Sequence, residues 1–93
     1  MVMDFEWDAD KSDWNLRERG YGFDFAALIF EGSPIEWQDT RKDYGETRIV
    51  AIGEVGEVVL TVVYTDRSDV RRIIASWPSS DKEREKWRLS KNP

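Results

Sequence analysis

Apolar and polar residues follow two different periods along this chain, so the sequence predicts both strands and helices. At the start, Phe5 and Trp7 alternate with Glu6 and Asp8, a period of two that is typical of a short strand or extended arm. Further along, apolar residues recur at helical spacing. The chain is therefore expected to form an α+β fold.

Two helices are predicted after the first strand. The first covers residues 11–19, with Asp10 able to cap its start and Gly20 able to end it. The second ends at Gly32, and its apolar stripe at positions i, i+3, i+4 and i+7 consists of Phe23, Ala26, Ala27 and Phe30. Together these helices form a hairpin that needs an apolar surface to cover.

Four strands are predicted to provide that surface. They cover residues 35–38, 48–53, 57–65 and 70–77. The nearly continuous apolar run in 57–65 predicts a central strand buried on both faces, and the short turns predict antiparallel neighbours.

A last helix is predicted after Pro78, which ends the sheet. Ser80 and Glu83 have the spacing of a capping box, and the helix should reach about Leu89, with residues 89–93 frayed. The predicted architecture is thus one domain over residues 1–93. It has two N-terminal helices, an antiparallel meander of about four strands and a C-terminal helix.

Composition limits the chemistry that this domain can perform. The 93 residues include no Cys and no His, so thiolate and imidazole groups cannot serve as nucleophile, general base or metal ligand. Catalysis would have to use carboxylates, Tyr, Lys or Arg. The acidic N-terminus lacks the pattern of a signal peptide and the longest apolar run is too short to cross a bilayer, so we expect a cytoplasmic protein.

Charge is distributed unevenly between the two halves. Residues 1–46 hold 12 acidic and 5 basic side chains, a balance of −7, whereas residues 47–93 hold 7 acidic and 9 basic ones, a balance of +2. Contact with nucleic-acid phosphate is therefore expected in the second half. The alternative is that both halves present ordinary solvated charge.

Arginines near the ends of the predicted strands form a candidate phosphate site. Strand alternation places Arg72, Ile74 and Ser76 on one face and Arg71, Ile73, Ala75 and Trp77 on the other. We expect Arg48, Arg67 and Arg72 to gather near Tyr64 at one region of the sheet. Guanidinium groups suit a phosphate that is attacked by the 2′-OH of its own RNA strand. Ordinary surface arginines and a Glu46–Arg48 ion pair are the alternative.

Several segments, taken in order, resemble the BrnT family of bacterial toxins. The segment 45–53 is similar to a G-E-x-R-x-x-A-I-G pattern of that family, and 64–67 is similar to its Y/H-T-E/D-R stretch. The other matching residues are Phe5 to Asp8, Lys11, Asn15, Arg19, Gly20, Phe23, Ala26, Ala27, Phe30, Arg72 to Ile74, Glu83 and Trp87.

This resemblance implies a RelE-like fold and a toxin of a type II toxin–antitoxin system. It implies a metal-independent endoribonuclease that arrests translation and uses no cofactor. The implied partner is a BrnA-type antitoxin with a ribbon-helix-helix domain, through which the pair binds operator DNA.

The implied site combines the candidate arginines with neighbouring residues. The catalytic candidates are Arg48, Tyr64, Arg67 and Arg72. The supporting candidates are Glu46, Thr65 and Glu83. The candidates for further RNA contact are Arg71, Lys82, Arg84 and Lys86.

One departure from the family pattern bears on activity. Trp77 stands where the pattern has an arginine, and the loss of one charge-stabilising donor typically costs about a hundredfold or more in rate. A second interpretation therefore stays open, in which the same scaffold has little nuclease activity and serves as a protein-binding module.

Overall fold

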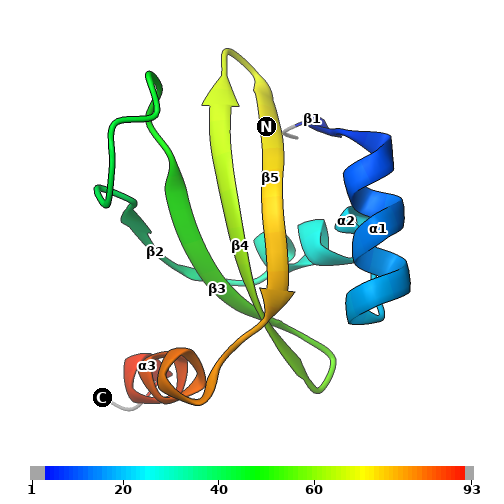
Figure 1. Cartoon of the computed structure of the whole chain (residues 1–93). Coiled ribbons are helices and arrows are strands. Elements are labelled where there is room, and N and C mark those ends of the chain that lie inside the picture. Colours follow the sequence, from blue (N-terminus) through cyan, green and yellow to red (C-terminus); the bar gives the residue numbers. More distant parts are fainter. Residues whose placement is uncertain (1–3, 92–93) are drawn as a thin grey trace.

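The computed structural model describes residues 4–91, which form a five-stranded sheet with helices on both of its faces (Figure 1). The elements in chain order are β1 (Asp4–Trp7), α1 (Ala9–Arg19), α2 (Phe23–Ala26), η1 (Ala27–Glu31), β2 (Ile35–Gln38), β3 (Ile49–Val55), β4 (Val58–Arg67), β5 (Val70–Pro78) and α3 (Asp81–Lys91). The predicted α+β class and C-terminal helix are confirmed. No helix within 4–91 is long and apolar enough to span a membrane.

The sheet contains the predicted antiparallel meander and one additional strand. Its order is β1-β5-β4-β3-β2, and β2 to β5 pair with their chain neighbours in antiparallel fashion. β1 lies parallel to β5, with Glu6 opposite Arg72, so the sheet has five strands rather than about four. The sequence predicted an extended segment at residues 5–8, but it did not predict that this segment pairs with β5.

The N-terminal helices differ in detail from the prediction. α1 begins at Ala9 because Asp8, not Asp10, caps it: one Asp8 oxygen accepts from the backbone N–H groups of Asp10 and Lys11. Gly20 ends the helix at φ 90°, as expected for a left-handed cap.

The second helix is a single α-helical turn followed by the 3₁₀-helix η1. Phe23, Ala26 and Ala27 are buried as the stripe predicted, but Ile29 is also buried, with 1% of its surface exposed. The tighter 3₁₀ winding turns Ile29 toward the sheet, where Gly53 provides the space.

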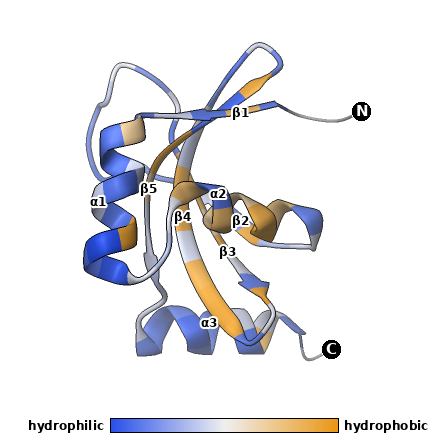
Figure 2. Ribbon diagram, turned by 90° about the vertical axis from the view of Figure 1, so that its right-hand side faces the viewer, coloured by the Kyte–Doolittle hydropathy of each residue, from blue (hydrophilic) through white to orange (hydrophobic). Residues whose placement is uncertain are grey.

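Both faces of β4 are covered, as its apolar run predicted. We call the face that carries Leu60, Val62 and Tyr64 the core face, because α1, α2 and η1 pack over it. The other side, which carries Thr61, Val63 and Thr65, we call the second face. Figure 2 shows hydrophobic residues concentrated on the central strands and on α2 and η1, whereas α1 and α3 are mostly hydrophilic.

α3 covers one end of the second face, next to the end of β5 (Figure 1). Trp87 anchors it and is buried, as predicted. The capping box is present: the Glu83 N–H donates to Ser80 Oγ at 3.2 Å, and the Ser80 N–H donates to Glu83 Oε1 at 2.8 Å. The helix reaches Lys91 rather than Leu89, and residues 92–93 of the expected frayed tail lie outside the described residues.

A β-bulge corrects the predicted faces of β5. Val63 pairs with Ala75 but Tyr64 pairs with Ile73, so Ile74 is an extra residue in the ladder. Beyond the bulge the alternation is reversed. Arg71, Ile73 and Ser76 therefore share the core face, and Arg72, Ala75 and Trp77 share the second face.

We predict that Gly53→Ala destabilises the protein by about 1–3 kcal/mol, the usual cost of overpacking a tight core. A Cβ atom at position 53 would lie 2.7 Å from Ile29 Cβ and 3.3 Å from Pro34 Cβ. Denaturant unfolding measures the change. Glu54→Ala, at an exposed position on the same strand, should shift stability by no more than about 0.5 kcal/mol. Equal stability of the two variants would show that η1 does not press on β3 here.

Candidate functional site

All three predicted catalytic arginines lie on the second face, at the end of the sheet away from α3. Thr65 marks this end of β4 and pairs with Arg72 of β5. Arg67 follows two residues later, on the same face as Thr65. Arg48 directly precedes Ile49, which pairs with Tyr64, so the ladder puts Arg48 on the side of Thr65. We call Arg48, Arg67 and Arg72 the arginine cluster.

Each arginine of the cluster has a carboxylate nearby, but the contacts are long. Glu46 lies between two of them, 3.9 Å from Arg48 and 3.5 Å from Arg67. Glu6 of β1 lies 3.6 Å from Arg72. All of these side chains are partly exposed, and ion pairs in such positions typically contribute about 1 kcal/mol or less. The contacts are weak enough for a phosphate to displace them.

Arg48 is held in place by its surroundings more than by charge. Its guanidinium lies 4.0 Å from the centre of the Tyr44 ring, a cation–π contact that leaves its edge free. Its Nε is buried and finds no hydrogen-bond partner among residues 4–91. Thr65 supports the same position, because its hydroxyl donates to the Thr47 carbonyl at 2.7 Å.

Tyr64 does not join the arginine cluster, which corrects the prediction that it would. Strand alternation puts its side chain on the core face, where its hydroxyl donates to Glu36 Oε1 at 2.9 Å. Its ring packs edge-on against Phe30. Burial, and then the bond to Glu36, raise the pKa of Tyr64 well above its ordinary value of 10.0.

Arg71 shares the core face with Tyr64. Its guanidinium lies 4.0 Å from the centre of the Tyr64 ring and 4.7 Å from that of Phe30. It also donates two hydrogen bonds to Asp66, at 2.8 and 2.9 Å, which raise its pKa. With two aromatic rings against its guanidinium and two hydrogen bonds to Asp66, Arg71 has little capacity left for phosphate.

The predicted RNA contacts on α3 lie at the opposite end of the second face. Lys82, Arg84 and Lys86 are exposed. The Lys86 ammonium lies 4.0 Å from the centre of the Trp37 ring. Glu83, predicted to support the arginines, instead caps α3 and accepts from Trp77 Nε1 at 3.1 Å.

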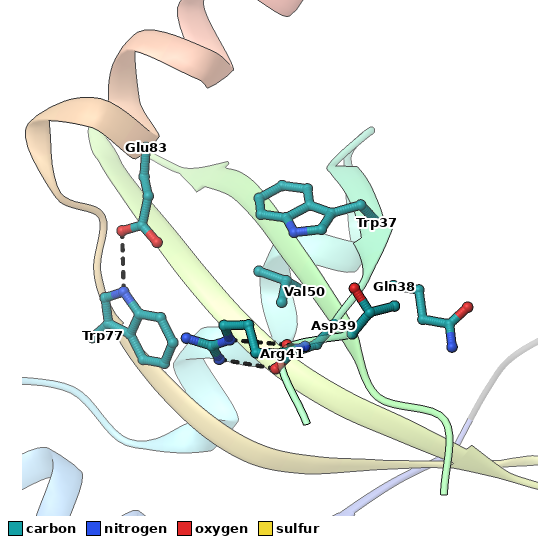
Figure 3. Close-up of a pocket in the computed structure, with 8 residues that line it drawn as sticks. Trp37, Gln38, Asp39, Arg41, Val50, Trp77 and Glu83 are labelled. Atoms are coloured by element: carbon teal, nitrogen blue, oxygen red, sulfur yellow. Dashed lines mark hydrogen bonds and ion pairs between the residues drawn. The ribbon is translucent and has the colours of Figure 1, made fainter. Parts of the chain in front are cut away.

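Trp77 lies beside α3 rather than among the arginines. It pairs with Thr61, four residues along β4 from the Thr65–Arg72 pair, a separation of about 13 Å at the usual rise of a strand. Figure 3 shows its ring at the edge of a cavity, with Trp37 across the opening. A phosphate can therefore reach the arginine cluster without meeting Trp77.

Sequence reasoning missed the partners that come from distant segments. Glu6 and Glu36 contact site residues through pairings that no local pattern indicates. Tyr44 and the Asp39–Arg41 ion pair belong to a polar segment without periodicity. A partial signal existed for both Glu6 and Glu36, because each alternates with apolar neighbours in a predicted strand.

Comparison with known families decides the relationship. A family model described as "Ribonuclease toxin, BrnT, of type II toxin-antitoxin system" matches residues 7–83, most of the chain. This chain belongs to the BrnT toxin family. The resemblance recognised in the sequence is thereby confirmed. A search of curated proteins found no match.

Membership of the BrnT family indicates which kinds of molecule this protein encounters. A ribonuclease toxin of a type II system implies an RNA substrate and an antitoxin partner. The matched region contains all three arginines together with Glu46, Thr65 and Glu83, and it ends before Arg84 and Lys86.

We predict that Tyr64→Phe lowers stability by about 1 kcal/mol, the usual contribution of one hydrogen bond, and leaves RNA cleavage unchanged. Because the pKa of Tyr64 is raised in the fold, the unfolded chain releases this proton first, and wild-type stability should fall as pH rises above about 10. The variant should show less of this alkaline loss in denaturant unfolding. A large loss of RNA cleavage by the folded variant would show that Tyr64 is a catalytic residue.

Proposed function

We propose that this protein is an endoribonuclease that cuts RNA without a metal ion, through attack of a 2′-hydroxyl on the adjacent phosphate. The arginine cluster would bind the scissile phosphate and stabilise the charge that develops on it. The observation that carries the proposal is the gathering of Arg48, Arg67 and Arg72 on one face with weak, partly exposed carboxylate contacts.

Arginine suits this step for geometric reasons. Its planar fork donates two parallel hydrogen bonds to phosphate oxygens, and it stays charged at any physiological pH. Arg48 makes only a long contact with Glu46, at 3.9 Å from one of its terminal nitrogens, so its guanidinium keeps donors for such a pair. Bound phosphate would replace Glu46 and Glu6 in their long ion pairs, at a small cost because these pairs are partly exposed.

Glu46 would then take part in proton transfer. In the step, the 2′ oxygen forms a bond to phosphorus while the bond from phosphorus to the 5′ oxygen breaks. The products are a 2′,3′-cyclic phosphate and a 5′-hydroxyl. The Glu46 carboxylate, freed from Arg48 and Arg67, would accept the proton of the 2′-hydroxyl, and the leaving oxygen would take one from water.

Residues outside the cluster would hold the rest of the RNA. Lys82, Arg84 and Lys86 are exposed on α3, at the other end of the same face, and could contact neighbouring phosphates. Arg71 is left out of the proposed site, because Asp66 and two aromatic rings already engage it.

We further propose that the activity arrests translation in the cytoplasm and that a BrnA-type ribbon-helix-helix antitoxin neutralises it. Membership of a type II family supports the antitoxin. The balance of −7 in residues 1–46 offers a surface suited to a basic partner.

A protein-binding module without catalysis is the second candidate. Two observations favour it: every arginine of the cluster has a carboxylate within 4 Å, and the chain as a whole carries a charge of −5. In that case the ion pairs would persist in the presence of RNA.

We predict that Arg48→Ala and Arg72→Ala each slow RNA cleavage by the purified protein by about a hundredfold or more, the usual cost of losing one charge-stabilising donor. Rates should be measured under single-turnover conditions. Expression of the wild-type chain without an antitoxin should slow bacterial growth, and Arg72→Ala should relieve this effect.

Arg17→Ala is the matched control, because Arg17 is an exposed arginine of α1, on the other side of the sheet. This variant loses the same charge and should cleave RNA at the wild-type rate. Intact RNA after incubation with the folded wild-type protein would favour the binding module. Cleavage at equal rates by all three variants would show that the arginine cluster is not the active site.

A further inference from the structure

The second face also holds a cavity beside Trp77 that the arginine cluster does not explain. It has a volume of about 290 Å³ and opens between β2, β5 and α3 (Figure 3). Its lining includes Trp37, Asp39, Arg41, Val50, Trp77 and Glu83. The size suits one small planar group.

We propose that this cavity binds a single unstacked base of the RNA, and that it favours adenine, cytosine or guanine over uracil. The inference rests on the proposed function, since it gives the same RNA strand a second point of contact. Two features carry it: a pair of indole rings and one free carboxylate oxygen.

The indole rings supply the stacking surface. Trp37 and Trp77 border the cavity from different strands (Figure 3). Trp77 is fixed by its hydrogen bond to Glu83, so its ring is already oriented before a base arrives. Lys86 lies against Trp37 at 4.0 Å, which places a positive charge beside the cavity for the phosphate of the same nucleotide. Exposed aromatic rings stack well on single-stranded bases because every base has a flat face.

The carboxylates of the cavity differ in the bonds that they already make. Asp39 accepts from Arg41 through both of its oxygens and also from the Tyr44 hydroxyl, contacts that hold the pKa of Asp39 well below its ordinary value. Glu83 accepts from Trp77 and Ser80 through Oε1. Its Oε2 makes no hydrogen bond within residues 4–91.

This free oxygen is the basis of the predicted selectivity. A carboxylate accepts hydrogen bonds and donates none. Adenine, cytosine and guanine each carry an exocyclic amino group that can donate to it, whereas uracil presents carbonyl oxygens at the corresponding positions. Uracil would therefore meet the Glu83 oxygen with a carbonyl oxygen, and the one donor on its edge, the ring N3–H, lies between two carbonyl groups that the carboxylate repels.

The cavity and the arginine cluster can be occupied by one strand. Val50 lines the cavity and lies two residues from Arg48 along the chain, on the same face. Trp77 lies about 13 Å from Arg72 along the sheet. A short single strand that places its phosphate at the cluster would carry a neighbouring base to the cavity.

Binding of 2′-O-methyl RNA octamers tests this inference, because these strands lack the attacking hydroxyl and cannot be cut. Fluorescence anisotropy should show that the full chain binds oligo-A and oligo-C more tightly than oligo-U. Trp77→Leu should weaken binding of oligo-A and oligo-C by about 5- to 150-fold, the range for loss of one stacked base. Trp77→Phe, which keeps an aromatic ring, should recover most of the affinity.

Glu83→Gln tests the selectivity without removing the cap, since Gln also functions in a capping box. Its amide can turn a donor toward the cavity, so the preference should shift toward oligo-U. Trp14→Leu is the control, because Trp14 is 47% exposed on α1, away from the cavity. Circular dichroism melting checks that each variant is folded.

The outcome separates the two proposals. Unchanged affinity in folded Trp77→Leu, or a wild-type preference for oligo-U, would overturn the base site even if Arg72→Ala still slows cleavage. The expected binding pattern in a protein that cuts no RNA would uphold the base site and reject the nuclease.

Discussion

The alternation of side chains along β4 is the constraint on which the site depends. Tyr64 and Thr65 are neighbours in the chain, yet they face opposite sides of the sheet. Tyr64 thereby joins the packed core, and Thr65 orders the backbone beside Arg48. The bulge at Ile74 keeps this division across β5, because it sends Arg72 to the same face as Thr65 and leaves Arg71 with Tyr64.

The arginines on the two faces of the sheet have different surroundings. On the core face, Arg71 lies between aromatic rings and a fully engaged Asp66, so its guanidinium stabilises the packing of the strand ends. On the second face, the arginine cluster has long contacts to Glu46 and Glu6, which hold the side chains without saturating their donors. A charged group that is positioned but incompletely bonded is suited to a ligand that brings stronger acceptors, and phosphate is such a ligand.

Much of the fold followed from local patterns. The apolar run of β4, the meander, the capping box at Ser80 and the stop at Gly20 all depend on nearby residues, and the structure has them. The parallel pairing of β1 could not be predicted, because it joins segments more than 60 residues apart in the chain. The bulge left no sequence signal either, and it reversed the predicted faces beyond Ile74.

The site was predictable in part for the same reason. Sequence reasoning selected Arg48, Arg67 and Arg72 correctly as neighbours, because adjacent strands bring them to one end of the sheet. The prediction grouped Tyr64 with these arginines because Tyr64 lies close to them in the strand order, although its side chain is on the other face of the sheet. Both Glu6 and Glu36 lie on edge strands. Glu6 contacts Arg72 through the pairing of distant segments, and Glu36 contacts Tyr64 on the core face.

Nuclear magnetic resonance of the arginine Nε–H groups would test most directly whether the second face holds the phosphate. During titration with a 2′-O-methyl RNA octamer, we expect the signals of Arg48, Arg67 and Arg72 to shift, with that of Arg71 unmoved. A shift of the Arg71 signal, with the three others unaffected at saturating RNA, would contradict this account.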